Sequence, residues 1–240
     1  MPHSVPIAPS RWISARLPNA RWGTLLLWIV LALLATGCAT SRPGGVRYGK
    51  ASAGYVKDNK PAIWISDHPR VAHFREHYRK TITVQVALNN GKPYIPTAVR
   101  IFRNKGLPEE LAYLPMLESK FENKADSGHA RGMWQFTKQT AEHVGLRVGA
   151  FADERLNWRK STEAAANYLD ELGEKFNYNW AMALAAYNGG PNYVDQEMKR
   201  QKTWDFFQLR LRKETEEYVA RFVAMIQVAR EKYPEAIATR

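Results

Sequence analysis

The sequence contains a single cysteine, Cys38, and has fewer acidic than basic residues over its 240 positions. A lone cysteine forms no intrachain disulfide, and it excludes the paired-cysteine motifs of zinc and thiol redox sites. Alternating polar and apolar runs, internal repeats and a heptad pattern are also missing, which argues against β-sheets, repeat arrays and coiled coils. Hydrophobic residues nevertheless make up 45% of the chain, so a wholly disordered protein is excluded.

The sequence also lacks a dense apolar run long enough to span a membrane as a helix. Its N-terminal run, Thr24 to Ala35, has twelve residues, whereas a transmembrane helix needs about 20. Three arginines and no acid precede this run, and small residues follow it. This order is typical of a secretory signal peptide. Because the uncharged stretch from Trp22 to Ser41 is longer, an uncleaved signal anchor is the alternative.

The segment Leu34 to Cys38 (LATGC) resembles a bacterial lipobox. The resemblance implies cleavage before Cys38 and acylation of that cysteine, which would anchor the protein to a membrane through lipid chains. Ala39, in place of aspartate, implies sorting to the outer membrane, so we expect a periplasmic, lipid-anchored protein. We therefore expect a lipoprotein signal peptide over 1–37, followed over 38–66 by the lipidated cysteine and a flexible tether rich in Ser, Gly, Pro and Lys.

Residues 67–240 are predicted to form one helix after another. Val71 and Phe74 begin a series of apolar residues three or four positions apart, as one face of an α-helix requires. Pro108 and Pro191 stand where proline commonly opens a helix. We therefore expect an all-α domain with a single hydrophobic core over 67–240.

The formal net charge of +12 first suggests a nucleic-acid partner. Its distribution argues against one. Residues 1–40 hold three arginines and no acid, residues 41–100 hold 11 basic and 3 acidic residues, and residues 101–240 hold 21 basic and 20 acidic residues. The charge is thus concentrated in the signal, the tether and the first helix, where it would meet anionic lipid or wall polymer. We expect no nucleic-acid partner.

Glu118 is the first candidate for chemistry. It ends the apolar run Leu111 to Leu117, which we expect to be helical. The negative end of a helix dipole and apolar neighbours both raise the pKa of a carboxyl group, and a raised pKa suits a general acid at neutral pH. On this local argument alone, a solvated glutamate at a helix end is the simpler explanation.

Three further segments follow Glu118-Ser119 in order: Ser127 to Gln135 (SGHARGMWQ), Ala185 to Gly190 (AAYNGG) and Lys213 to Val219 (KETEEYV). Together the four segments resemble the lysozyme-like superfamily of soluble lytic transglycosylases, and most closely the catalytic domain of its membrane-bound murein transglycosylases of type D. The resemblance runs from about residue 70 to about residue 235. It implies a lysozyme-like (goose-type) helical fold and peptidoglycan glycan strands as the substrate. It implies neither a metal nor a cofactor.

Residue by residue, the resemblance implies that Glu118 is the catalytic acid and that Ser119 hydrogen-bonds and orients it. With Ser119, the substrate-binding positions that it implies are Met133, Trp134, Gln135, Tyr187, Asn188 and Tyr218. By composition alone, Trp134 fits the core as well as it fits a platform for sugar. Gly128 and Gly132 permit positive φ and would let a polymer approach the backbone.

The implied reaction uses one carboxylate, whereas most hydrolysing glycosidases use two. Glu118 would protonate the β-1,4 bond between N-acetylmuramic acid and N-acetylglucosamine, and it would then take the proton of the muramic O6 hydroxyl. That oxygen closes a 1,6-anhydro ring, so no water is consumed. The substrate's own N-acetyl carbonyl would stabilise the cationic sugar, with Tyr187 and Asn188 orienting it.

Two alternatives are consistent with the same segments. A goose-type lysozyme hydrolase would use water as the nucleophile, with Glu122 or Asp126 as its second carboxylate. A non-catalytic peptidoglycan-binding lipoprotein would bind the wall without turnover.

Arg131 and Lys138 depart from the family pattern and would add positive charge beside the glycan. A partner in the cell-envelope machinery, endo or exo cleavage and stem-peptide preference stay open.

Overall fold

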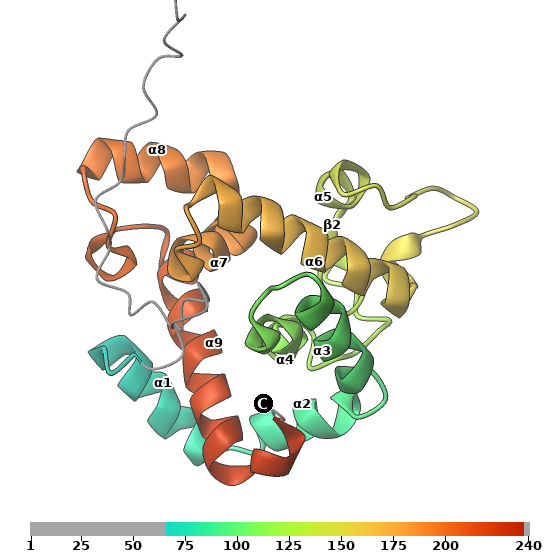
Figure 1. Cartoon of the computed structure of the whole chain (residues 1–240), viewed down its shortest axis with the longest axis horizontal. Helices are drawn as coiled ribbons and strands as arrows, with labels where there is room; N and C mark the ends of the chain where they lie inside the picture. Colours follow the sequence, from blue (N-terminus) through green and yellow to red (C-terminus); the bar gives the residue numbers. More distant parts are fainter. Residues whose placement is uncertain (1–65, 238–240) are drawn as a thin grey trace, which may run out of the picture. The chain divides into compact units, whose positions relative to one another are not determined.

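The computed structural model describes residues 66–237, which form a mostly helical domain (Figure 1). Its α-helices are α1 (Pro69–Arg79), α2 (Thr83–Gly91), α3 (Ile95–Asn104), α4 (Pro115–Glu118), α5 (Lys138–His143), α6 (Trp158–Lys175), α7 (Trp180–Gly189), α8 (Pro191–Gln201) and α9 (Lys213–Lys232). Short 3₁₀ helices lie between them, η2 (Glu109–Tyr113), η3 (Glu154–Leu156) and η4 (Phe206–Gln208), and another, η5 (Pro234–Ala236), follows α9. The expected helical domain is confirmed for these residues.

The expectations for the N-terminal part of the chain lie outside the described residues. These are the signal peptide over 1–37, the lipidated Cys38 and all but the last residue of the tether over 38–66. Within residues 66–237, none of the helices is both long and apolar enough to cross a membrane.

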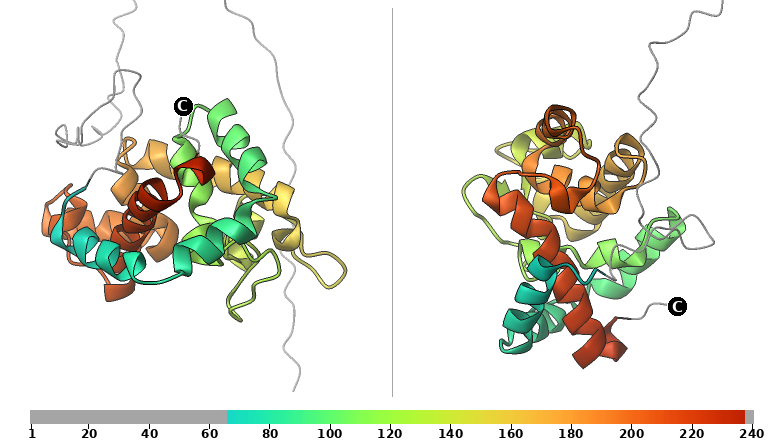
Figure 2. Two further views of the ribbon diagram at one scale, coloured as in Figure 1. Left: turned by 90° about the horizontal axis from the view of Figure 1, so that it is seen from below. Right: turned by 90° about the vertical axis from the view of Figure 1, so that its left-hand side faces the viewer.

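The longest helix, α9, is the element around which the others are arranged. It packs against α1, α2, α4 and α7, and α1 lies alongside it in both views (Figures 1 and 2). Tyr218, Phe222 and Ile226, which are four positions apart and so share one face of this helix, are buried. Because α9 contacts both α4 and α7, it can hold residues from distant parts of the sequence close together.

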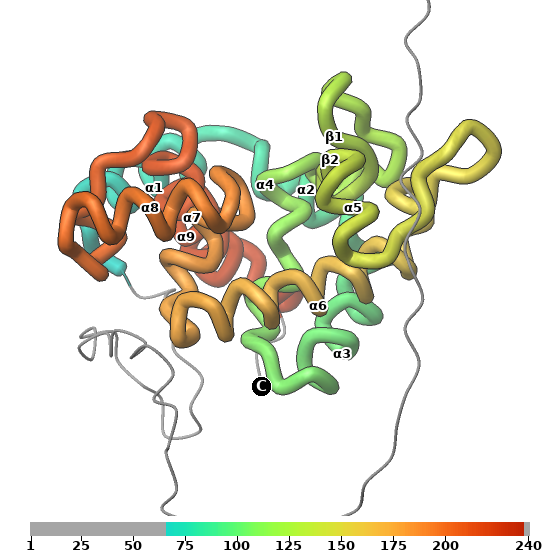
Figure 3. Tube along the Cα trace, turned by 90° about the horizontal axis from the view of Figure 1, so that it is seen from above, coloured from blue at the N-terminus to red at the C-terminus, as the bar shows by residue number. Residues whose placement is uncertain are grey.

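A second group of helices packs around α7. Helix α6 contacts α3 and α7, and α7 also contacts α8 and α9 (Figure 3). Every residue from Trp180 to Ala186 is buried, as is usual for a helix enclosed by its neighbours. Tyr187 and Asn188 are only partly buried, so they lie where this helix emerges from the core.

A small hairpin, which the sequence analysis did not predict, interrupts the helices. β1 (Ala130–Arg131) pairs antiparallel with β2 (Phe136–Thr137), with Ala130 opposite Thr137 and Arg131 opposite Phe136. Strands of two residues are too short to show the alternation by which a strand is recognised. The turn of the hairpin is residues 132–135, the segment that the resemblance placed at the substrate.

Gly132 begins this turn in a place where only glycine fits. Its φ is +79°, and an added Cβ would lie 2.0 Å from the carbonyl oxygen of Arg155. Gly128 has a similar φ of +83°, but nothing lies within 4 Å of its added Cβ. The backbone that approaches Gly132 is therefore the chain's own, which corrects the expectation that this glycine admits a polymer.

Two arginines connect the hairpin to η3. Arg155 is 7% exposed, pairs with Asp153 at 2.7 Å and donates to the carbonyl of Phe136 at 3.2 Å. Arg131 pairs with Asp126 at 2.6 Å and with Asp153 at 3.3 Å. The charge of Arg131 is thus balanced by two nearby carboxylates, which corrects the expectation that it is available to an anionic glycan.

Gly132→Ala should destabilise the domain much more than Gly128→Ala. Both substitutions place a Cβ at positive φ, but only the one at Gly132 meets a backbone atom. We expect a loss of about 3 kcal/mol or more in the free energy of unfolding for Gly132→Ala, and of about 1–2 kcal/mol for Gly128→Ala. Urea denaturation of the two variants measures the difference, and equal losses would contradict the close contact with Arg155.

Candidate active site

Glu118 is the last residue of α4 and is partly buried. Its pKa is raised from 4.5 to about 7: burial is the main cause, a hydrogen bond from Tyr218 opposes it, and the charge of Glu214 adds to it. Because α4 has only four residues, its dipole is too short to matter much. The raised pKa agrees with the sequence prediction, and of the two expected causes burial among apolar neighbours is the one that acts, not the helix dipole.

Tyr218 of α9 donates a hydrogen bond from its hydroxyl to Oε1 of Glu118. The tyrosine is 6% exposed, and burial together with the nearby charge of Glu118 raises its pKa well above its ordinary value. The hydroxyl therefore stays protonated and remains a donor whichever state Glu118 adopts. The structure thus brings together two residues 100 positions apart that the resemblance placed at one site.

Tyr187 of α7 is also close enough to Glu118 to feel the charge of its carboxyl group. Burial raises its pKa well above the ordinary value, and the charge of Glu118 and the neighbouring Tyr168 add to the effect. Its hydroxyl donates to the carbonyl oxygen of Trp134 at 2.8 Å. Tyr187 therefore connects the end of α7 to the hairpin turn beside Glu118.

Asn188 is held between two residues of the first turn of α9. Its side-chain amide donates to Oε1 of Glu214 at 3.3 Å, and its carbonyl oxygen accepts from the hydroxyl of Thr215 at 2.8 Å. Both ends of the amide are thus oriented by α9. Gly189 has no room for a side chain, since an added Cβ would lie 2.9 Å from the same Thr215 hydroxyl.

Met133 and Trp134 are core residues, which corrects the expectation that their side chains bind substrate. Both are 0% exposed. The Trp134 indole N–H donates to the hydroxyl of Thr162 at 3.0 Å, and its ring stacks on Phe102 with centroids 5.8 Å apart. What these two residues offer to the site is their backbone carbonyls, which accept hydrogen bonds from neighbouring side chains.

Ser119 and Gln135 are partly buried and bond to the hairpin turn. The Ser119 hydroxyl donates to the carbonyl of Met133 at 2.8 Å, so it orients the end of α4 through the turn and not through a hydrogen bond to Glu118. The side-chain amide of Gln135 donates to the carbonyl of Gly132 at 2.8 Å, inside the turn itself. Contact of either residue with substrate stays a prediction.

The carboxylate that acts on Glu118 is one that the sequence analysis gave no role. Asp126 accepts hydrogen bonds from the backbone of Gly128 and from Arg131, which lower its pKa and hold its carboxylate within the loop. Glu122 is exposed. Glu214 instead contacts Asn188 and raises the pKa of Glu118. Its spacing of four from Tyr218 puts the two residues on one face of a helix, a signal that was present in the sequence.

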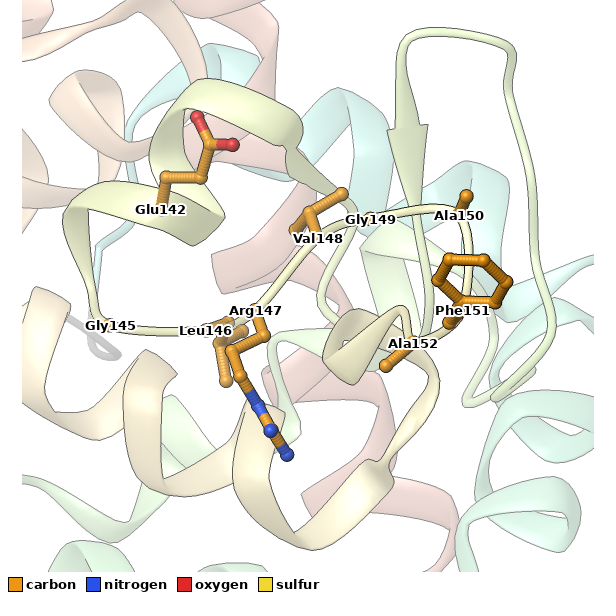
Figure 4. Close-up of a pocket in the computed structure, with 9 residues that line it drawn as sticks. All are labelled: Glu142, Gly145, Leu146, Arg147, Val148, Gly149, Ala150, Phe151 and Ala152. Atoms are coloured by element: carbon orange, nitrogen blue, oxygen red, sulfur yellow. The ribbon is translucent and has the colours of Figure 1, made fainter.

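No group of three or more metal-binding side chains occurs among residues 66–237. A surface hollow of about 510 Å³ lies along the loop between α5 and η3 and is lined by Glu142 and residues 145–152 (Figure 4). It contains none of the residues around Glu118, and the side chain at its tip, Phe151, is fully exposed. The candidate site is therefore the cluster around Glu118.

Comparison with known proteins identifies the family of the chain. Residues 99–209 match the family described as the transglycosylase SLT domain, a span that holds Glu118, the hairpin and α7. Membrane-bound lytic murein transglycosylase D of Escherichia coli (strain K12) is 32% identical in an alignment 171 residues long, which covers 68% of this chain and 38% of that protein. The protein of the same name from Escherichia coli O6:H1 (strain CFT073) gives the same figures. The chain thus spans 38% of the length of these curated relatives.

Glu118→Gln should stabilise the domain at high pH but not at low pH. A carboxyl group whose pKa is raised by folding favours the folded state below its unfolded pKa of 4.5, and that contribution is lost as the pH rises through about 7. Glutamine stays neutral and can still accept from Tyr218. We expect the variant to be more stable than the wild type by up to about 3 kcal/mol at pH 8 and equally stable at pH 4. Chemical denaturation across this range tests it, and a difference independent of pH would contradict the raised pKa.

Tyr218→Phe and Glu214→Gln should move the pKa of Glu118 in opposite directions. Removing the tyrosine hydroxyl removes a donor that stabilises the carboxylate, so the pKa should rise above about 7. Removing the negative charge at 214 should lower it. NMR titration of the glutamate carboxyl carbons measures both shifts. Glu217→Gln, a matched change on the same helix at a residue paired with Arg221, serves as the control and should leave the titration unchanged.

Proposed function

Because residues 99–209 belong to the transglycosylase SLT domain family and the chain is homologous to membrane-bound lytic murein transglycosylase D, we propose that this protein is a lytic transglycosylase that cleaves peptidoglycan glycan strands. The observation that carries the proposal is the partly buried carboxyl group of Glu118, whose pKa is about 7. A group with this pKa can give up a proton and take one back at neutral pH.

In the first step Glu118 is the general acid. Since Tyr218 donates to Oε1, the acidic proton of Glu118 lies on Oε2. It passes to the glycosidic oxygen between N-acetylmuramic acid and N-acetylglucosamine as the bond from that oxygen to C1 of the muramic acid breaks. The remaining carboxylate keeps the hydrogen bond from Tyr218, which offsets part of the cost of a buried charge.

In the second step the same carboxylate is the general base. It removes the proton of the muramic O6 hydroxyl while that oxygen attacks C1, which closes the 1,6-anhydro ring and restores the protonated acid. Between the steps the substrate's N-acetyl carbonyl stabilises C1. Asn188 aligns that group in this proposal, which its fixed orientation by Glu214 and Thr215 supports. One proton leaves Glu118 and one returns, so the reaction consumes no water.

Hydrolysis by a goose-type lysozyme mechanism is the second candidate, and one observation favours it. Glu214 is a second carboxylate close enough for its charge to raise the pKa of Glu118. Two carboxyl groups are what an inverting glycosidase needs to activate water. Glu214 already accepts a hydrogen bond from Asn188, so we give this candidate second place.

We also propose that the enzyme works in the periplasm, anchored to the outer membrane by lipid on Cys38. The lipobox-like segment 34–38 supports this location, and the relatives' name calls them membrane-bound. Peptidoglycan strands and the membrane are then its partners. We further propose that an assembly of the cell envelope recruits the enzyme.

Digestion of purified sacculi with the purified chain tests the reaction. We expect muropeptides ending in 1,6-anhydromuramic acid in the mass spectrum, and a loss of about 10²–10⁴-fold in rate for Glu118→Gln. Glu122→Gln, the same change at an exposed residue, is the control and should keep full activity. Reducing-end products would identify a hydrolase. Sacculus binding without any product from the wild type would identify a non-catalytic binding protein.

A further inference from the structure

Arg212 is an exposed arginine that the proposed mechanism does not use. It stands directly before α9, and Nη2 of its guanidinium donates to the carbonyl oxygen of Gly189 at 2.7 Å. The guanidinium carbon lies 4.3 Å from the ring centroid of Tyr193, whose hydroxyl accepts from the backbone N–H of Arg212 at 2.8 Å. The charged group is thus held in one place by a hydrogen bond and a ring contact.

The positive charge of Arg212 is not balanced by an acid within residues 66–237, although three glutamates lie within five positions of it. Each of these glutamates is bonded to another group: Glu214 to the amide of Asn188, Glu216 to the backbone N–H of Leu211, and Glu217 to the guanidinium of Arg221. An exposed arginine that is oriented but lacks a carboxylate is suited to receive one.

Arg212 is connected to the residues around Glu118 through Gly189 and Asn188. Gly189, which its guanidinium contacts, follows Asn188 directly, and Asn188 contacts Glu214, whose charge acts on Glu118. A guanidinium has five N–H donors in a plane, and the contact with Gly189 occupies one of them. The others remain for a planar anion bound next to Asn188.

The proposed substrate carries such an anion on only one of its two sugars. N-acetylglucosamine has no ionised group, whereas the lactyl ether of N-acetylmuramic acid ends in a carboxyl group that is either free or joined to a stem peptide with carboxylates of its own. We propose that Arg212 binds a carboxylate on this branch of the muramic acid and so determines which sugar lies beside Asn188. This inference rests on the proposed function and adds a specificity residue to it.

Three substrates test the inference: strands with intact stem peptides, strands stripped of peptide with free lactyl carboxylates, and stripped strands whose carboxylates have been converted to neutral amides. For Arg212→Gln we expect kcat/KM to fall about tenfold, mainly through a higher KM, on strands with carboxylates. On the amide strands it should stay within twofold of the wild type. A loss confined to intact strands identifies a stem-peptide carboxylate, and one confined to stripped strands identifies the lactyl carboxylate.

Controls show whether Arg212 binds a carboxylate or acts only structurally, through its hydrogen bond to Gly189. Arg210→Gln removes the same charge from an exposed residue two positions away and should change no substrate's kcat/KM. An equal loss on all three substrates for Arg212→Gln, or no loss on any, would overturn the inference while leaving the proposed function intact. If the wild type released no anhydro product from any of the strands, the proposed function itself would fail.

Discussion

The hydrogen bond from Tyr218 to Glu118 is the contact on which the rest of the site depends. It joins α9 to α4 across 100 positions of sequence, and it supplies a neutral donor to a carboxyl group that burial would otherwise hold protonated more strongly. Burial alone would make Glu118 a poor acid at neutral pH, because the carboxylate that it leaves behind would be unstabilised. With the donor in place, the pKa of Glu118 is about 7, so at neutral pH the group can both give up a proton and take one back.

The hairpin turn supports this contact through its backbone. Its carbonyls at 133 and 134 accept from Ser119 and Tyr187, so the end of α4 and the end of α7 are bonded to the same short segment. Two contacts fix this segment: the ring of Trp134 is buried in the core, and Gly132 lies against the backbone of Arg155. The buried side chains of this segment therefore act mainly by keeping its backbone rigid. The rigid backbone in turn holds the partly exposed residues around Glu118 in position.

The pKa of Glu118 is raised, whereas those of two other carboxyl groups of the domain are lowered. Asp126 and Asp153 are bonded to arginines and have lowered pKa values, so they stay ionised and serve the scaffold. Among residues 66–237 no cation forms an ion pair with Glu118, and the nearby Glu214 raises its pKa further. Arg212, which bonds to the residue after Asn188, pairs with no acid within the described part of the chain, and this unpaired charge is what suggests an anionic group on the ligand.

The sequence by itself determined the helical fold, because apolar periodicity is written along the chain. It also singled out Glu118, through its apolar neighbours together with the three ordered segments that follow it, and the raised pKa agrees with that choice. Its ordered segments also named the other residues of the site. Only the tertiary structure decided what each one contacts. Trp134 is in the core, Ser119 bonds to a carbonyl, Arg131 is neutralised, and Glu214 joins the cluster. These outcomes depend on contacts between residues far apart in sequence, where burial and distance set hydrogen bonding and pKa, and neither quantity is present in a local pattern.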